Sequence, residues 1–400
     1  MINIRKEPFK KMFKYIFLIS IFIIFLWPAS IWGGSSNYSF VLLAVGVVLL
    51  KGSFKTLSPN LTVMILFYTI LFLVSTLYQF EFMRYLDRRV ISFIIFMTMF
   101  SYVIINIDQD MVRAFKIATV LLVIYFIIYI LKVYFFELGG AAIGFSAKGL
   151  LGNHRYGFVY LLAFWILMLN KSQLISVNIL RIACIFIILS GSLLTFSRSV
   201  IIGLVGSLIL FYLSNFINRK NKLSLRFFLT AVAYLVFLLL FIILLHKFLP
   251  LTFNFFDQRL LSVFSIEGFN ELFNVTKDKN SSEGFRLFLL GKILNFVSSN
   301  PFTGSGFLGC WIMFEDLQCS AHSQYNDVLF RTGIFGFSLY ILILFNIFKY
   351  LKSTHQDLFW GFVSILIYGI FHETFKQSHG AFILAFLFGM MITAKRNSNL

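Results

Sequence analysis

Long apolar segments separated by short polar connections run along the whole chain. Segments of this kind are long enough to cross a hydrocarbon core of about 30 Å as helices. They are continuously apolar instead of alternating, which predicts helices and not the strands of a barrel. We therefore predict an all-α integral membrane protein with about 12 transmembrane helices. The segments lie near residues 13–31, 38–50, 61–79, 90–106, 114–136, 156–170, 177–195, 198–215, 225–248, 323–349, 358–371 and 380–394.

The composition excludes a water-soluble domain. Hydrophobic residues make up 59% of the 400 residues and charged residues only 12%. A soluble domain of this size would expose large apolar patches with such a balance. The solvent of most of the chain is expected to be lipid.

The basic connections predict the orientation of the chain in the membrane. They fall on the side of the amino terminus, so the positive-inside rule predicts that both termini are cytoplasmic. The long segment between the ninth and tenth helices is then periplasmic. The predicted regions are 1–249 with helices one to nine, 250–321 as a periplasmic loop region, and 322–400 with helices ten to twelve and a cytoplasmic tail. The connections carry Lys51, Lys55, Arg113, Lys116, Lys171, Arg219, Lys220, Lys222, Arg226, Lys349, Lys352, Lys395 and Arg396.

The first apolar segment and the cysteines each allow two interpretations. Basic residues before an apolar run and then Pro28 resemble a cleaved signal peptide, but a run ahead of many further spans is better interpreted as an uncleaved first helix.

Cys184 is expected to be an apolar filler within a span. Cys310 and Cys319 share one loop and could form a disulfide in an oxidising compartment.

Acidic residues do not occupy the middle of any predicted span. Asp327 and Glu373 come closest, each within about two turns of the outer face. Proton-coupled transporters need carboxylates near the midplane, so this distribution disfavours a transporter.

Cations and histidines gather where even-numbered helices begin at the outer face. Helix amino ends carry free backbone N–H groups and a positive dipole end, and guanidinium groups add charge and a fork that matches an anion. This pattern favours binding of a membrane-embedded phosphate ester, although a single arginine there can also meet lipid headgroups or a local carboxylate. The residues are His154 and Arg155, Arg198, His322, and His379, with Lys148 nearby.

Three stretches in the second half of the chain carry a recognisable pattern. The first is Ser197-Arg198, and the second runs from Ser281-Ser282-Glu283-Gly284-Phe285-Arg286 through an amphipathic stretch to the turn Asn300-Pro301-Phe302-Thr303-Gly304-Ser305-Gly306. The third is His322-Ser323 followed by Gly333-Ile334-Phe335-Gly336. The prolyl-glycyl turn should reverse the chain sharply, and the glycines should thin one face of the tenth helix so that a neighbour can pack closely.

In this order and topology, the three stretches resemble the O-antigen ligase and polymerase family over roughly residues 150–394. The resemblance implies that Arg198 and Arg286 hold the pyrophosphate of an undecaprenyl-linked glycan, and that His322 acts at the acceptor or the leaving group. A helix-capping role is the alternative for His322.

Further residues are expected to contact substrate or to support the site. Asp327 and Arg331 are four residues apart and should pair in support of His322. His372, Lys376 and His379 lie three or four residues apart and could contact the acceptor or form an ordinary helix interface. The predicted substrate-binding residues are Lys148, His154, Arg155, Arg331 and His379. We expect transfer without a metal or other cofactor, because the predicted outer face has no metal-ligand spacing, as the resemblance also implies.

The predicted activity is a glycosyltransferase in the bacterial inner membrane that works at the periplasmic face. A polymerase would extend O-antigen or a related surface polysaccharide on a lipid-linked repeat unit, whereas a ligase would transfer the glycan to the lipid A core. A lipid-linked oligosaccharide transporter is a third possibility. The expected partners are the lipid-linked donor, one of those acceptors, membrane lipids and a chain-length regulator, with no nucleic acid.

Overall fold

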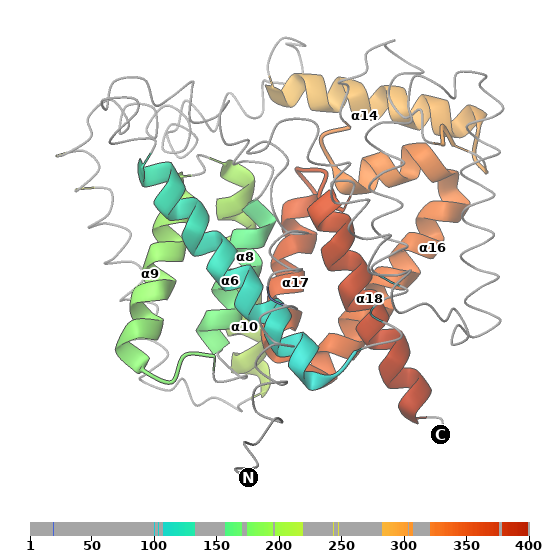
Figure 1. Ribbon diagram of the computed structural model, residues 1–400. Coiled ribbons are helices and arrows are strands. Elements are labelled where there is room, and N and C mark those ends of the chain that lie inside the picture. Colours follow the sequence, from blue (N-terminus) through green and yellow to red (C-terminus); the bar gives the residue numbers. More distant parts are fainter. Residues whose placement is uncertain are drawn as a thin grey trace. The chain divides into compact units, whose positions relative to one another are not determined.

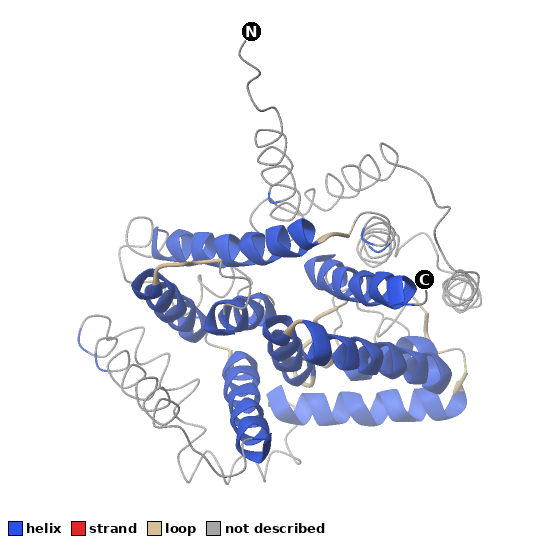
Figure 2. Ribbon diagram, turned by 90° about the horizontal axis from the view of Figure 1, so that it is seen from below, coloured by secondary structure: helices blue, strands red, loops and turns tan. Residues whose placement is uncertain are grey.

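The computed structural model describes residues 19, 100, 103, 107–132, 157–169, 174–194, 197–218, 243, 247, 282–302, 304–306, 321–375 and 378–398. In these residues every regular element is an α-helix (Figure 2). The all-α prediction is confirmed for this part of the chain. The predicted spans 13–31, 38–50, 61–79, 90–106 and 225–248 lie almost wholly outside the described residues, as do Cys310 and Cys319.

The described helices coincide closely with the predicted apolar segments. One further helix, α14, occupies the stretch before the prolyl-glycyl turn. The helices are α6 (Gln109–Lys132), α8 (Gly157–Leu169), α9 (Asn178–Leu194), α10 (Arg198–Asn218), α14 (Ser282–Ser299), α16 (Gln324–Thr354), α17 (Gln356–Gly369) and α18 (Ser378–Ser398) (Figure 1).

Within the described residues, α6, α10 and α16 are long and apolar enough to cross a membrane. Shorter apolar helices lie at Gly157–Leu169, Asn178–Ser192, Phe288–Ser299 and Gly380–Ala394. The total of about 12 transmembrane helices and the periplasmic location of the long loop region stay predictions.

The chain forms two compact units. The first unit consists of the described residues within Met1–Leu122, Asp278–Phe359 and Gly369–Leu400. The second unit consists of those within Val123–Lys277 and Trp360–Tyr368. The helices α6 and α17 each contribute residues to both units.

The second unit packs around a buried tryptophan. Its helices α8, α9 and α10 lie against one another, and α8 is buried from Gly157 to Leu167. The indole Nε1 of Trp165 donates to Ser364 Oγ at 2.6 Å and to Ser207 Oγ at 3.1 Å. These bonds satisfy a buried N–H group and tie α8 to α10 and α17. Buried Cys184 on α9 agrees with its predicted role as a filler.

Aromatic and aliphatic contacts build the first unit. Phe115 of α6 stacks on Phe386 of α18, with ring centroids 4.1 Å apart. The helix α14 runs crosswise to α18 (Figure 1). It buries Leu289, Ile293 and Val297, spaced four residues apart, against Ala321 and Phe330. This core fixes the turn that follows α14 close to the start of α16.

A buried ion pair joins α6 to the first turn of α17 in the first unit. Lys116 Nζ lies 2.6 Å from Asp357 Oδ2, and the two side chains are 2% and 0% exposed. The positive-inside prediction treated Lys116 as an orientation signal in a polar connection. The structure instead places Lys116 inside α6 and gives it a carboxylate partner from α17.

Removing one partner of this pair should destabilise the protein strongly. Asp357→Ala leaves the buried Lys116 ammonium without its carboxylate, which costs about 3 to 5 kcal/mol in comparable buried pairs. The thermal unfolding midpoint in detergent should fall accordingly. The double variant Lys116→Met with Asp357→Leu should recover most of the loss, and a double variant as unstable as Asp357→Ala would contradict this explanation.

His355 connects α16 to α17 beside the same ion pair. Burial lowers the pKa of its imidazole, the Lys116 ammonium lowers it further, and the Asp357 carboxylate raises it. The unfolded chain, with an ordinary histidine pKa of about 6.5, therefore binds more protons at this position than the folded protein.

The stability contribution of neutral His355 should be complete above about pH 6.5 and should be lost as the pH falls through the lower folded-state pKa. Thermal unfolding of the detergent-solubilised protein across this range checks the sign. His355→Gln has no imidazole and should reduce the slope of midpoint against pH. Equal slopes for the two proteins would exclude His355 as the source.

Candidate functional site

The turn after α14 docks on a kink in α16 by exchanging backbone hydrogen bonds. Gly333 has φ 64° and ψ −172°, which interrupts α16. The N–H of Ile334 donates to the carbonyl of Pro301 at 2.7 Å instead of to Phe330, its usual helical acceptor. The freed carbonyl of Phe330 accepts from the N–H of Ser305 at 2.9 Å. In the same way, the carbonyl of Arg331 accepts from the N–H of Gly306 at 2.9 Å.

Glycine is required on both sides of this docking contact. A Cβ on Gly333 would lie 2.3 Å from the carbonyl oxygen of Pro301, and one on Gly304 would lie 2.5 Å from that of Arg331. Both residues also have positive φ, at 64° and 61°, which side chains disfavour. The turn and the Gly-x-x-Gly stretch are therefore parts of one structure.

The prediction that these glycines let a neighbour pack closely holds for Gly333 and needs correction for Gly336. The close neighbour of Gly333 is the backbone of Pro301 and Phe302, in the turn. The space at Gly336 is taken by the side chain of Thr332, on the same helix. Without tertiary contacts, a glycine that serves a kink has the same sequence signature as one that serves helix packing.

Arg331 fixes the turn through its side chain as well. Its Nε donates to Asp327 Oδ2 at 2.8 Å, which confirms the predicted pair, and its Nη1 donates to the carbonyl of Gly306 at 3.1 Å. Asp327 and Arg331 are 2% and 7% exposed. Arg331 thus links the first turns of α16 to the docked turn. Its predicted contact with substrate stays a prediction.

His322 lies immediately before α16 in an unusual backbone conformation. Its φ is 52°, and among the described residues it is the one non-glycine residue with positive φ. Histidine tolerates this left-handed region better than most residues, but the conformation persists only where surrounding contacts hold it. The cap of α16 is Ser323, whose Oγ accepts from the N–H of Asn326 at 3.5 Å. The structure therefore gives the capping role to Ser323 and not to His322.

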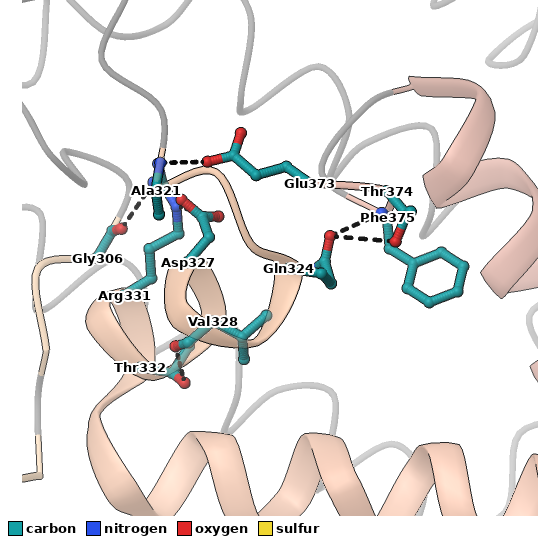
Figure 3. A network of polar contacts seen from close by, with 10 residues as sticks. All are labelled: Gly306, Ala321, Gln324, Asp327, Val328, Arg331, Thr332, Glu373, Thr374 and Phe375. Carbon is teal, nitrogen blue, oxygen red and sulfur yellow. Dashed lines mark hydrogen bonds and ion pairs between the residues drawn. The ribbon is translucent and has the colours of Figure 1, made fainter. Parts of the chain in front are cut away.

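The segment between α17 and α18 binds Ala321 and Gln324, which lie on either side of His322 in the sequence (Figure 3). On the amino side, the N–H of Ala321 donates to Glu373 Oε1 at 2.6 Å. On the carboxyl side, the N–H of Gln324 donates to the carbonyl of His372 at 3.1 Å. The Oε1 of Gln324 also accepts from the N–H of Phe375 at 2.8 Å. These bonds fix His322 relative to the end of α17.

The remaining predicted residues lie in several places. Arg286 is on α14, which packs against the start of α16 through Phe296 and Phe330, with ring centroids 4.8 Å apart. Arg198 is the first residue of α10, exposed, and belongs to the second unit. His379 is the second residue of α18. Lys148, His154, Arg155 and Lys376 lie outside the described residues.

Sequence reasoning missed two residues of this arrangement. The roles of Gln324 and Glu373 as side-chain acceptors depend on contacts between segments about 50 residues apart, and their local sequence gives no signal for them. Within the described residues, no group of three or more His, Cys, Asp or Glu side chains could hold a metal ion.

Gly333→Ala should separate the turn from α16. Positive φ at alanine costs about 1 to 3 kcal/mol, and the Cβ clash with Pro301 adds to that cost. The unfolding midpoint should fall, and the region around residue 300 should become sensitive to protease. Gly291→Ala is a matched control, because Gly291 on α14 has open space around its Cβ position, and it should be neutral or slightly stabilising. Equal effects of the two substitutions would contradict the docking role.

Comparison with protein families supports the resemblance inferred from the sequence. The model of the family described as O-Antigen ligase matches residues 183–341. This range includes Arg198, Arg286, His322, the docked turn and the kink at Gly333. A comparison with curated proteins gave no match. Together with the apolar helices, the family match indicates a membrane protein with a glycosyltransferase-type activity. The match over residues 183–341 supports the resemblance of this chain to the O-antigen ligase and polymerase family.

Proposed function

We propose that this protein is a polymerase of O-antigen or a related surface polysaccharide, which transfers a glycan from an undecaprenyl-pyrophosphate donor to a lipid-linked repeat unit. The observation that carries the glycan-transfer part of the proposal, which a polymerase and a ligase share, is His322. It lies within the family match, in a left-handed backbone conformation that contacts on both flanks maintain. A strained residue held in this way is typical of an active site.

In the proposed reaction, the acceptor hydroxyl attacks the anomeric carbon of the donor sugar. A new glycosidic C–O bond forms, and the bond from that carbon to the pyrophosphate oxygen breaks. His322 accepts the proton of the hydroxyl, a task suited to imidazole near neutral pH. The lipid pyrophosphate leaves with the electron pair of the broken bond.

The leaving pyrophosphate gains negative charge, which cationic side chains can stabilise. We assign this role to Arg198 and Arg286. Lys148, His154, Arg155 and His379 are proposed to contact the donor or acceptor. Arg331 supports the site by holding the turn at residues 300–306, because its guanidinium binds Asp327 and the Gly306 carbonyl. No metal or other cofactor enters this mechanism.

The proposed location is the bacterial inner membrane, with both termini in the cytoplasm and the site at the periplasmic face. The basic connections between apolar segments support this orientation. The lipid-linked donor and acceptor are membrane components and would reach the site from the bilayer. A chain-length regulator is a proposed protein partner.

A ligase is the second candidate function, and the description of the matched family favours it. Both reactions use the same donor, so the proposed roles of His322 and the two arginines apply to either. The acceptor differs, being a lipid-linked repeat unit for a polymerase and a lipid A core sugar for a ligase.

Deletion of the gene, followed by gel analysis of the surface glycan, separates the two functions. Loss of a polymerase should leave core bearing a single repeat unit. Loss of a ligase should leave bare core and accumulate lipid-linked polymer. An unchanged glycan ladder would exclude both activities.

Substitution of His322 tests the site in the same deletion strain. His322→Asn removes the base and keeps a residue that tolerates left-handed backbone, so the protein should insert normally yet fail to restore the ladder. Loss of one general base lowers rates about 100- to 10,000-fold. His322→Ala should be equally inactive and less stable. A normal ladder from membrane-inserted His322→Asn would contradict the proposed role.

A further inference from the structure

The carboxylate of Glu373 is tied to the residue that precedes His322. Glu373 is half-buried in the segment between α17 and α18, and its Oε1 accepts the N–H of Ala321 at 2.6 Å. Figure 3 shows the Glu373 side chain extending to Ala321 across the start of α16.

The other hydrogen bonds in this region act on the carboxyl side of His322. Ser323 Oγ donates to the carbonyl of Gly369 at 3.5 Å, and Gln324 bonds to His372 and Phe375. These contacts hold the start of α16. The Glu373 contact holds the amino flank, so the two sides of His322 are anchored by different residues.

A residue with positive φ relaxes when either of its flanks is released. With the carboxyl flank fixed to α16 and the Ala321 side chain packed against α14, loss of the Glu373 contact would release the Ala321 N–H. The backbone between Ala321 and His322 could then rotate and return His322 to an ordinary backbone region. The imidazole would then move relative to any bound substrate. Displacement of a reacting group by about 1 Å can lower a rate about 100-fold.

We propose that Glu373 is a positioning residue for glycan transfer, which keeps His322 in its left-handed conformation by accepting the N–H of Ala321. This inference rests on the proposed function of His322. Glu373 lies beyond residue 341, where the family match ends, so the match itself gives it no role. Its contribution is the length and acceptor oxygen of its side chain, not its charge.

Three substitutions of Glu373 separate the effects of side-chain length, acceptor oxygen and charge. Glu373→Gln keeps the length and an acceptor oxygen without the charge. Glu373→Asp keeps the charge but is one methylene too short to reach Ala321 from the same backbone. Glu373→Ala removes both. The full-length protein is assayed in nanodiscs with lipid-linked glycan extracted from the deletion strain, and kcat and KM are measured separately.

The matched control is Asp108→Ala. The Asp108 carboxylate accepts the N–H of Met111 at 2.7 Å at the start of α6, which is the same kind of contact in the same unit. Its loss should lower the unfolding midpoint and leave kcat unchanged. The control thus shows what a purely structural loss of a carboxylate contact does to the assay.

We expect Glu373→Ala and Glu373→Asp to lower kcat about 10- to 100-fold with little change in KM, and Glu373→Gln to retain most of the activity. Wild-type kcat in Glu373→Asp would overturn the proposal, as would equal losses in Glu373→Gln and Glu373→Asp. If Glu373→Ala does not insert into the membrane, the kcat values of Glu373→Gln and Glu373→Asp are sufficient to test the proposal.

The same assay separates this inference from the proposed function. Activity in His322→Asn would refute the role of His322 whatever Glu373 does. An inactive His322→Asn together with normal kcat in the Glu373 variants would refute the positioning role alone.

Discussion

The kink at Gly333 and the turn at residues 300–306 exchange backbone hydrogen bonds, and this exchange fixes the helix that begins just after His322. Where α16 is interrupted, its unused carbonyls and N–H group bind the turn at residues 300–306. Buried backbone groups must find partners, so the kink and the turn require each other. The glycines at 304 and 333 allow the two backbones to approach, and Arg331 then reaches the carbonyl of Gly306. The exchange therefore joins α14, the turn and the start of α16.

A second set of contacts uses this fixed start of α16. The segment between α17 and α18 binds Ala321, Ser323 and Gln324, which leaves His322 between two anchored flanks. For the proposed base His322, such orientation would avoid the entropy cost of ordering the side chain during the reaction. The strain at His322 is thus offset by hydrogen bonds of neighbouring residues, and Ser323 supplies the helix cap in place of the imidazole.

Charged side chains have different roles at the two ends of the α16–α17 pair. At the start of α16, Asp327 and Arg331 support the docked turn. At the start of α17, Asp357 pairs with Lys116, beside His355. Buried charges need partners in a low-dielectric interior, and the Lys116–Asp357 pair also joins two helices. The common role of these charged residues is to hold helices and the turn in place, and it does not depend on the net charge of the protein.

The sequence by itself determined the helical class, the positions of most described helices, the resemblance to the O-antigen ligase and polymerase family, and the Asp327–Arg331 pair. Continuous apolar segments and i,i+4 spacing are local signals, and each depends on a few consecutive residues. Only the tertiary structure decided that Gly333 serves a kink, that Lys116 is a buried partner of Asp357, and that Glu373 holds the flank of His322. Such roles depend on which distant segments meet. The spacing of residues along one sequence does not indicate which segments those are.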